Sequence, residues 1–122
     1  MSHDALISAC VSDCDTSYRN ATGRSMSDVG LDPFGIVTAI LAIVAQMCPQ
    51  QARDLRAAAQ TRGAATVLAV QAATRQALRE QHPGVLLPWA RFNGAAIANA
   101  VIATVATRDE VQIQAGLECC GR

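Results

Sequence analysis

Five cysteines are the residues of this 122-residue chain whose type and spacing best lend themselves to chemistry. Cys10 and Cys14 are four residues apart, so on a helix their side chains project from the same face. Two thiols in this arrangement can share a metal ion or form a disulfide, and Cys119 and Cys120 would complete a set of four thiolates. Three interpretations of Cys10 and Cys14 therefore stay open: small apolar side chains in a core, a disulfide within or between chains, and a metal site.

The surroundings of these cysteines do not match a usual metal site, and we predict none. Structural zinc sites usually take their cysteine pairs from turns or knuckles. Cys10 and Cys14 lie instead in a helical pattern, and the adjacent Cys119 and Cys120 are a poor pair of ligands. We predict packing for the first pair, and cross-linking to a neighbouring chain in an oxidising setting for the second.

Cys48 directly precedes Pro49, near the predicted start of a helix. The helix dipole can lower the pKa of a thiol in such a position. No histidine follows nearby in the sequence to act as a base, because the two histidines are His3 and His82. We therefore interpret Cys48 as a buried or bridging cysteine rather than a nucleophile.

Arginine supplies every basic residue and is unevenly distributed. Residues 50–91 carry six arginines against two acids, a net charge of +4, whereas residues 1–32 carry five aspartates against two arginines, a net charge of −3. This asymmetry fits an ordinary solvated helix face, head-to-tail contact between subunits, or binding of phosphate groups. The candidate contact residues are Arg53, Arg56, Arg62, Arg75 and Arg79. Nucleic acid is the least favoured partner, because no aromatic residues alternate with these arginines and the formal net charge of the chain is zero.

The chain shows no catalytic motif. His3 and His82 are far apart, neither accompanies a serine or cysteine in a nucleophile arrangement, and no glycine-rich phosphate loop is present. We therefore expect a protein that is not an enzyme and has no cofactor.

Composition predicts the elements that position these residues. Hydrophobic residues make up 51% of the chain but aromatic residues only 3%, and alanine, the best helix former, is abundant. A chain of 122 residues has room for one domain. We predict a single all-α domain over residues 1–122, a compact bundle of four or five helices with a fully apolar central helix.

The first half of the chain divides into three segments. An apolar stripe that includes Cys10 and Cys14 predicts a helix over residues 2–19, and turn residues predict a loop over 20–31. Asp32-Pro33 is a typical helix start. The helix over residues 33–47 is apolar on every side, which indicates that it is buried among other helices or by a neighbouring subunit.

The second half leaves two questions open. Residues 50–81 are either one long helix or two helices hinged at Gly63. A helix follows over residues 88–107, and the tail over 108–122 is a short helix or a strand. Thr107 and Glu110 have the spacing of a capping box, whereas the alternation of residues 111–115 is typical of a strand.

The apolar runs at 34–47 and 94–107 are about 14 residues long, short of the roughly 20 that cross a bilayer. We expect no membrane span. No secretion signal is visible in the first residues, so we expect a protein that is cytoplasmic or incorporated in a particle.

These observations favour a non-catalytic structural or interaction subunit of a larger homo- or hetero-oligomeric assembly. A bacteriophage or other particle is a setting for such a subunit, with self-association and cysteines at contacts between subunits. The alternative is a small cytosolic sensor or regulator that uses Cys10 and Cys14 as a thiol or metal site.

Overall fold

The computed structural model describes the backbone of residues 5–47, 51–81 and 87–120, and the side chains of residues 5–46, 53–81 and 94–118. This part of the chain is all-helical, as expected, but has six α-helices rather than four or five. They are α1 (Ala5–Thr22), α2 (Pro33–Met47), α3 (Gln51–Thr61), α4 (Ala64–Gln81), α5 (Leu87–Thr107) and α6 (Glu110–Cys120), with a 3-10 helix η1 (Ser27–Val29) before α2.

The first helix runs to Thr22, three residues beyond the end that the sequence pattern indicated. It stops where Gly23 takes a left-handed conformation with φ of 81° and donates its N–H to the carbonyl of Arg19. The segment that follows was expected to be a loop, but it contains η1 and contributes to the core. Met26 is completely buried and Leu31 is 4% exposed.

The segment from residue 51 to residue 81 is two helices, and the residue that ends α3 is Arg62. Arg62 has a φ of 52°, the left-handed conformation that usually selects glycine. The N–H of Arg62 donates to the carbonyl of Ala59, and that of Gly63 to the carbonyl of Ala58, which together form a Schellman cap. The direction of the chain therefore changes one residue before the expected Gly63.

The tail forms the helix α6, not a strand. Asp109 caps it: its carboxylate accepts a hydrogen bond from the N–H of Gln112 at 2.9 Å, and its carbonyl from Ile113 at 3.1 Å. Thr107 does not serve as the cap, because its hydroxyl donates back to the carbonyl of Thr104 in α5.

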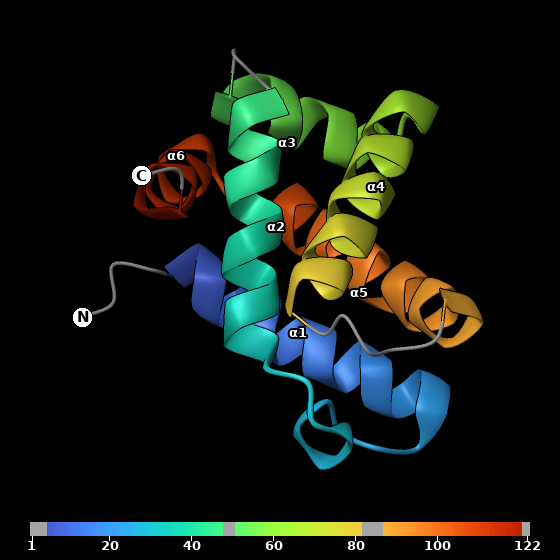
Figure 1. Ribbon diagram of the computed structural model, residues 1–122. Helices are drawn as coiled ribbons and strands as arrows, with labels where there is room; N and C mark the ends of the chain where they lie inside the picture. Colours follow the sequence, from blue (N-terminus) through green and yellow to red (C-terminus); the bar gives the residue numbers. More distant parts are fainter. Residues whose placement is uncertain (1–4, 48–50, 82–86, 121–122) are drawn as a thin grey trace.

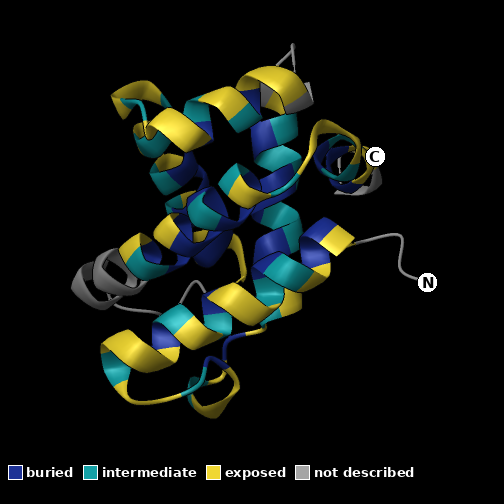
Figure 2. Cartoon of the chain, turned by 180° about the vertical axis from the view of Figure 1, so that it is seen from behind, coloured by how far each residue is buried: buried dark blue, intermediate teal, exposed yellow. Residues whose placement is uncertain are grey.

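The helices cross one another around a common core (Figure 1). In that view α2 stands at the front between α4 and α6, and α5 passes behind α4. α1 packs mainly against α5, which also packs against α3 and α4. The core is built mainly from aliphatic side chains and alanine, and Figure 2 shows that buried residues lie where the helices face one another.

One side of α2 is buried and the other is not. The buried side carries Ile36, Val37, Ile40, Leu41 and Val44. On the outer side Phe34 is 59% exposed, Gln46 is also exposed, and Thr38, Ala39, Ala42, Ile43 and Ala45 are only half-buried. α2 contains no charged residue. The single chain therefore does not enclose this helix on every side, and cover by a neighbouring subunit, the other alternative for residues 33–47, stays a prediction.

Candidate functional site

The inner face of α1 carries Cys10 and Cys14, and both are completely buried. The thiol of Cys14 donates to the carbonyl oxygen of Ile97 in α5, with the sulfur 3.7 Å from that oxygen. Both residues carry thiols rather than a disulfide. The spacing of four residues thus places both cysteines on the buried face of α1, with the sulfur of Cys14 in the contact with α5.

Electrostatics oppose ionisation of Cys14. Burial raises the pKa of the Cys14 thiol far above its ordinary value, and the nearby Cys10, Asp13 and Asp15 raise it further. The thiolate is the form that attacks an electrophile or binds a metal ion, so a thiol held neutral does neither. In the described part of the chain, no three or more His, Cys, Asp or Glu residues lie close enough to hold a metal ion. The geometry favours the packing interpretation of Cys10 and Cys14.

The remaining candidates for thiol chemistry fall outside the described side chains. Cys48 lies between two described segments, and the side chains of Cys119 and Cys120 follow the last described one. His3 and His82 are likewise outside.

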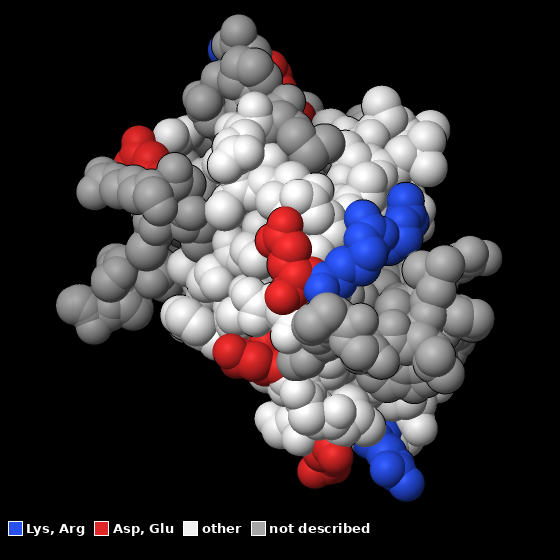
Figure 3. All heavy atoms as spheres, in the orientation of Figure 1, with Lys and Arg blue, Asp and Glu red and all other residues white. Residues whose placement is uncertain are grey.

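The candidate arginines are spread over two helices and do not form one site. Arg53 and Arg56 belong to α3, Arg62 ends it, and Arg75 and Arg79 lie in the second half of α4. The face of the molecule seen in Figure 3 shows basic side chains directly beside acidic ones, without a broad basic area. This distribution gives no support to a phosphate-binding surface on that face.

Arg56 and Arg108 have an unusual feature in common. The Nε atom of each is buried and has no hydrogen-bond partner. Close by, the Nε2 of Gln60 in α3 donates to the carbonyl of Ala106 at the end of α5, at 3.2 Å. Because solvent does not reach either Nε atom, an external anion could not reach it unless the side chain moved.

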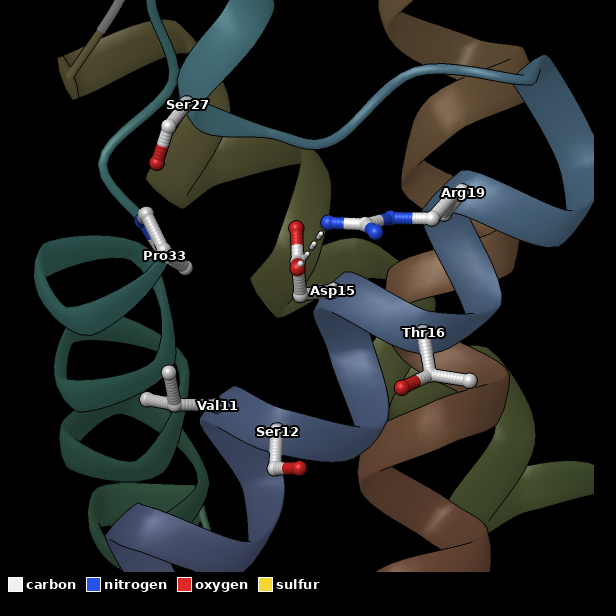
Figure 4. Close-up of a pocket in the computed structure, with 7 residues that line it drawn as sticks. All are labelled: Val11, Ser12, Asp15, Thr16, Arg19, Ser27 and Pro33. Carbon is white, nitrogen blue, oxygen red and sulfur yellow. Dashed lines mark hydrogen bonds and ion pairs between the residues drawn. The ribbon is translucent and has the colours of Figure 1, made fainter.

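A surface groove lies between α1 and the segment that leads into α2 (Figure 4). It has a volume of about 500 Å³ and is open to solvent; its lining residues are Val11, Ser12, Asp15, Thr16, Arg19, Ser27 and Pro33. The carboxylate of Asp15 is already engaged, with Arg19 at 3.4 Å and with the N–H of Met26 at 3.0 Å. Asp15 thus fastens the loop before η1 to α1, and the groove contains no nucleophile paired with a base.

A small apolar cavity is enclosed where α2, α3, α4 and α5 meet. Its volume is about 10 Å³, about the minimum for one water molecule, and aliphatic side chains and Thr66 line it. The cavity is too small for an organic ligand. It is a packing defect at the centre of the bundle.

The outer face of α2 is the remaining candidate, and its use would be association rather than chemistry. In Figure 3 an uncharged surface extends over the position of α2, with acidic and then basic side chains along one edge. The sequence alone showed that α2 has no charged residue. The burial pattern in the structure further shows which side of the helix is exposed, and that Phe34 lies on that side.

Comparison with protein-family models, with curated proteins and with solved structures gives no match for this chain. Among the described residues, no helix combines the length and apolar content that would carry it across a membrane.

Proposed function

We propose that this protein is a non-catalytic subunit that associates with further copies of itself through the outer face of α2. The observation that carries the proposal is the uncovered half of a helix without a charged residue, with Phe34 59% exposed at its first turn. Scattered exposed apolar residues are ordinary, but an uncovered face on a 15-residue helix that has no charged residue is typical of contact with another protein.

A larger assembly requires more than one such surface, because a single twofold contact closes after two copies. Leu68 in α4 is 63% exposed and Val111 in α6 is 79% exposed. Each offers an anchor for a second contact outside α2. Incorporation into a particle of many subunits is therefore part of the proposal.

The experiment that tests the proposal is the mass of the purified protein in solution. Light scattering should be measured over a range of protein concentrations, with and without reductant, alongside elemental analysis. We expect a mass that rises with concentration and persists in reductant, without stoichiometric metal. A monomer at every concentration would contradict the proposal, and bound zinc would favour a metal-dependent regulator instead.

A second measurement tests a thiol sensor at Cys10 and Cys14 directly. Because both thiols are buried, we expect neither peptide to be labelled by iodoacetamide in the native protein, as read by mass spectrometry. Both should be labelled in denaturant, which serves as the control. Rapid labelling of Cys10 or Cys14 in the folded protein would support the sensor.

A further inference from the structure

Most of the outer face of α2 does not require polar partners. The hydroxyl of Thr38, near the middle of this face, lies 3.0 Å from the carbonyl oxygen of Phe34 and 3.1 Å from that of Gly35, so its hydrogen-bonding need is met within the helix. The other outer side chains are the half-buried Ala39, Ala42, Ile43 and Ala45 and, near the C-terminal end, the exposed Gln46. A second apolar surface can therefore cover this face without burying an unsatisfied group, provided that the amide of Gln46 stays in solvent or bonds to the partner.

The two ends of α2 differ in charge. Asp28 and Asp32 lie at its N-terminal end. The last turn of α4 lies there too, because the side chain of Gln81 is 3.1 Å from the position that a Cβ on Gly35 would take. That turn carries Arg79 and Glu80, and the groove beside Pro33 adds the ion pair of Asp15 and Arg19, so four acids stand against two arginines among these residues. α3, which follows the other end, begins with two arginines, Arg53 and Arg56, and one acid, Asp54.

Asp32 and Arg53 are the exposed charges nearest to the two ends of α2 along the chain. Neither forms an ion pair with another described residue. A parallel pair of α2 helices would set acids against acids and arginines against arginines. An antiparallel pair sets each acidic end against a basic end, and also opposes the two helix dipoles.

We infer that the outer face of α2 binds the same face of a second copy in an antiparallel pair about a twofold axis, with Asp32 of each copy beside Arg53 of the other. This inference rests on the proposed function and specifies its surface. The axis passes near Thr38 and Ala42, since residues 32 and 53 lie at opposite ends of the contact. Phe34 of each copy then packs near Ala45 of the other.

The size of the face sets the strength of this contact. A helix of 15 residues is about 22 Å long, and stable dimers bury about 800 Å² on each partner. One helix face with its flanking side chains covers less than that area. The dimer should therefore be weak, with a dissociation constant on the order of micromolar, so it forms and dissociates with protein concentration.

A double-mutant cycle tests the arrangement, with the dissociation constant measured by analytical ultracentrifugation at low salt in reductant. The variants are Asp32→Asn, Arg53→Gln and the two together. Asparagine caps a helix as well as aspartate does, so Asp32→Asn should keep α2 intact. We expect each single substitution to raise the dissociation constant about five- to tenfold, because symmetry counts each lost pair twice.

The double variant should bind about as weakly as either single variant, since one interaction cannot be lost twice. Glu118→Gln, which removes an exposed acid on α6, is the control and should leave the dissociation constant unchanged. Two outcomes would overturn the antiparallel pairing while leaving self-association intact. In the first, the dissociation constant of the double variant rises by the product of the two single effects. In the second, Glu118→Gln raises the dissociation constant as much as the other substitutions do. A wild-type chain that stays monomeric would overturn the proposed function as well and leave the face to a different protein.

Discussion

The sulfur atom of Cys14 and the hydroxyl of Thr104 both join α1 to α5. Cys14 donates to the carbonyl of Ile97, and Thr104 lies 2.7 Å from the carboxylate of Asp13. The hydroxyl of Thr104 also lies 2.8 Å from the carbonyl of Ala100, so one proton serves two acceptors. These side chains of α1 stabilise its contact with α5. Because the sulfur of Cys14 is buried, it is restricted from reacting with molecules in solution.

The raised pKa of Cys14 predicts how stability changes with pH. The native thiol stays protonated while the thiol of the unfolded chain ionises above its ordinary pKa of about 8.5. The native state then holds one more proton, so the free energy of unfolding falls as pH rises above about 8.5, by up to about 1.4 kcal/mol per pH unit for this group. Below that pH the contribution is fully present.

Urea unfolding of the wild type and of Cys14→Ala between pH 7 and pH 10 measures this effect. The wild type should lose stability more steeply above pH 8.5 than the variant, whatever the difference between them at pH 7. Parallel pH profiles would show that Cys14 is not held neutral. Burial also raises the pKa of Tyr18, which affects both proteins equally, and only above about pH 10.

At some contacts between these helices, close packing depends on a glycine. A Cβ on Gly116 in α6 would lie 2.6 Å from Cδ2 and 2.9 Å from Cβ of Leu6, a buried residue of α1. A Cβ on Gly94 in α5 would meet nothing closer than 3.6 Å, the distance to Leu78. Two glycines within helices therefore have different roles, which only their neighbours reveal.

This difference predicts opposite effects of alanine at the two positions. Gly116→Ala should destabilise the protein by about 1–3 kcal/mol, because α1 and α6 must separate to admit the methyl group, less up to about 1 kcal/mol gained in helix propensity. Gly94→Ala is the matched control and should be neutral or stabilising by up to about 1 kcal/mol. Thermal unfolding followed by circular dichroism measures both. Equal effects at the two positions would refute the close contact of Gly116 with Leu6.

The hydrogen bond between α1 and α5 has a matched control in α4. Thr104→Val removes both the contact with Asp13 and the local bond to Ala100, whereas Thr74→Val removes only a local bond, to the carbonyl of Val70 at 2.8 Å. Both threonines are buried. We expect Thr104→Val to cost about 1–2 kcal/mol more than Thr74→Val in denaturant unfolding, since a hydrogen bond to a carboxylate is lost. Similar costs would mean that the Asp13 contact contributes little.

The sequence predicted the positions of the helices better than the contacts between them. The Asp32-Pro33 start and the break near Gly63 are local signals, because caps and turns depend on neighbouring residues. The left-handed Arg62 was not predictable, since its residue type disfavours that conformation. The contacts of Leu6 with Gly116 and of Asp13 with Thr104 join residues about 90 or more positions apart, and no periodicity specifies such pairs. The spacing of Cys10 and Cys14 showed that both lie on one face of a helix, but it could not show whether that face packs in the core or forms a thiol or metal site.

The whole molecule is a bundle with one incompletely enclosed helix. α2 contacts α1, α4 and α6 and leaves its remaining side to solvent, with Phe34 as its most exposed large side chain. Apolar area that is exposed in the folded subunit contributes no hydrophobic stabilisation until another surface covers it. Association is therefore expected to bury the apolar area of α2 that the single chain leaves exposed, and to be stabilised by that burial.

Phe34→Ala separates these two contributions. Because Phe34 is 59% exposed in the single chain, its truncation should change the free energy of unfolding of the monomer by less than about 1 kcal/mol. Self-association should weaken about tenfold or more, as expected for an aromatic anchor at an interface. Leu68→Ala, at the exposed side chain of α4 proposed for a second contact, is the comparison: it should limit assembly beyond the dimer and leave the α2 contact unchanged. Unchanged association of Phe34→Ala in light scattering would exclude Phe34 from the contact.

The packing of α1 on α5 also has a consequence for biosynthesis. The bond from Cys14 reaches Ile97, 83 residues later, and that from Thr104 returns to Asp13, 91 residues earlier. While the ribosome is still making the middle of the chain, α2 can already pack on α1, but the side of α1 that faces α5 stays uncovered. That side of α1 is thus among the last surfaces of the core to be covered, and a chaperone that binds nascent chains would find its target there.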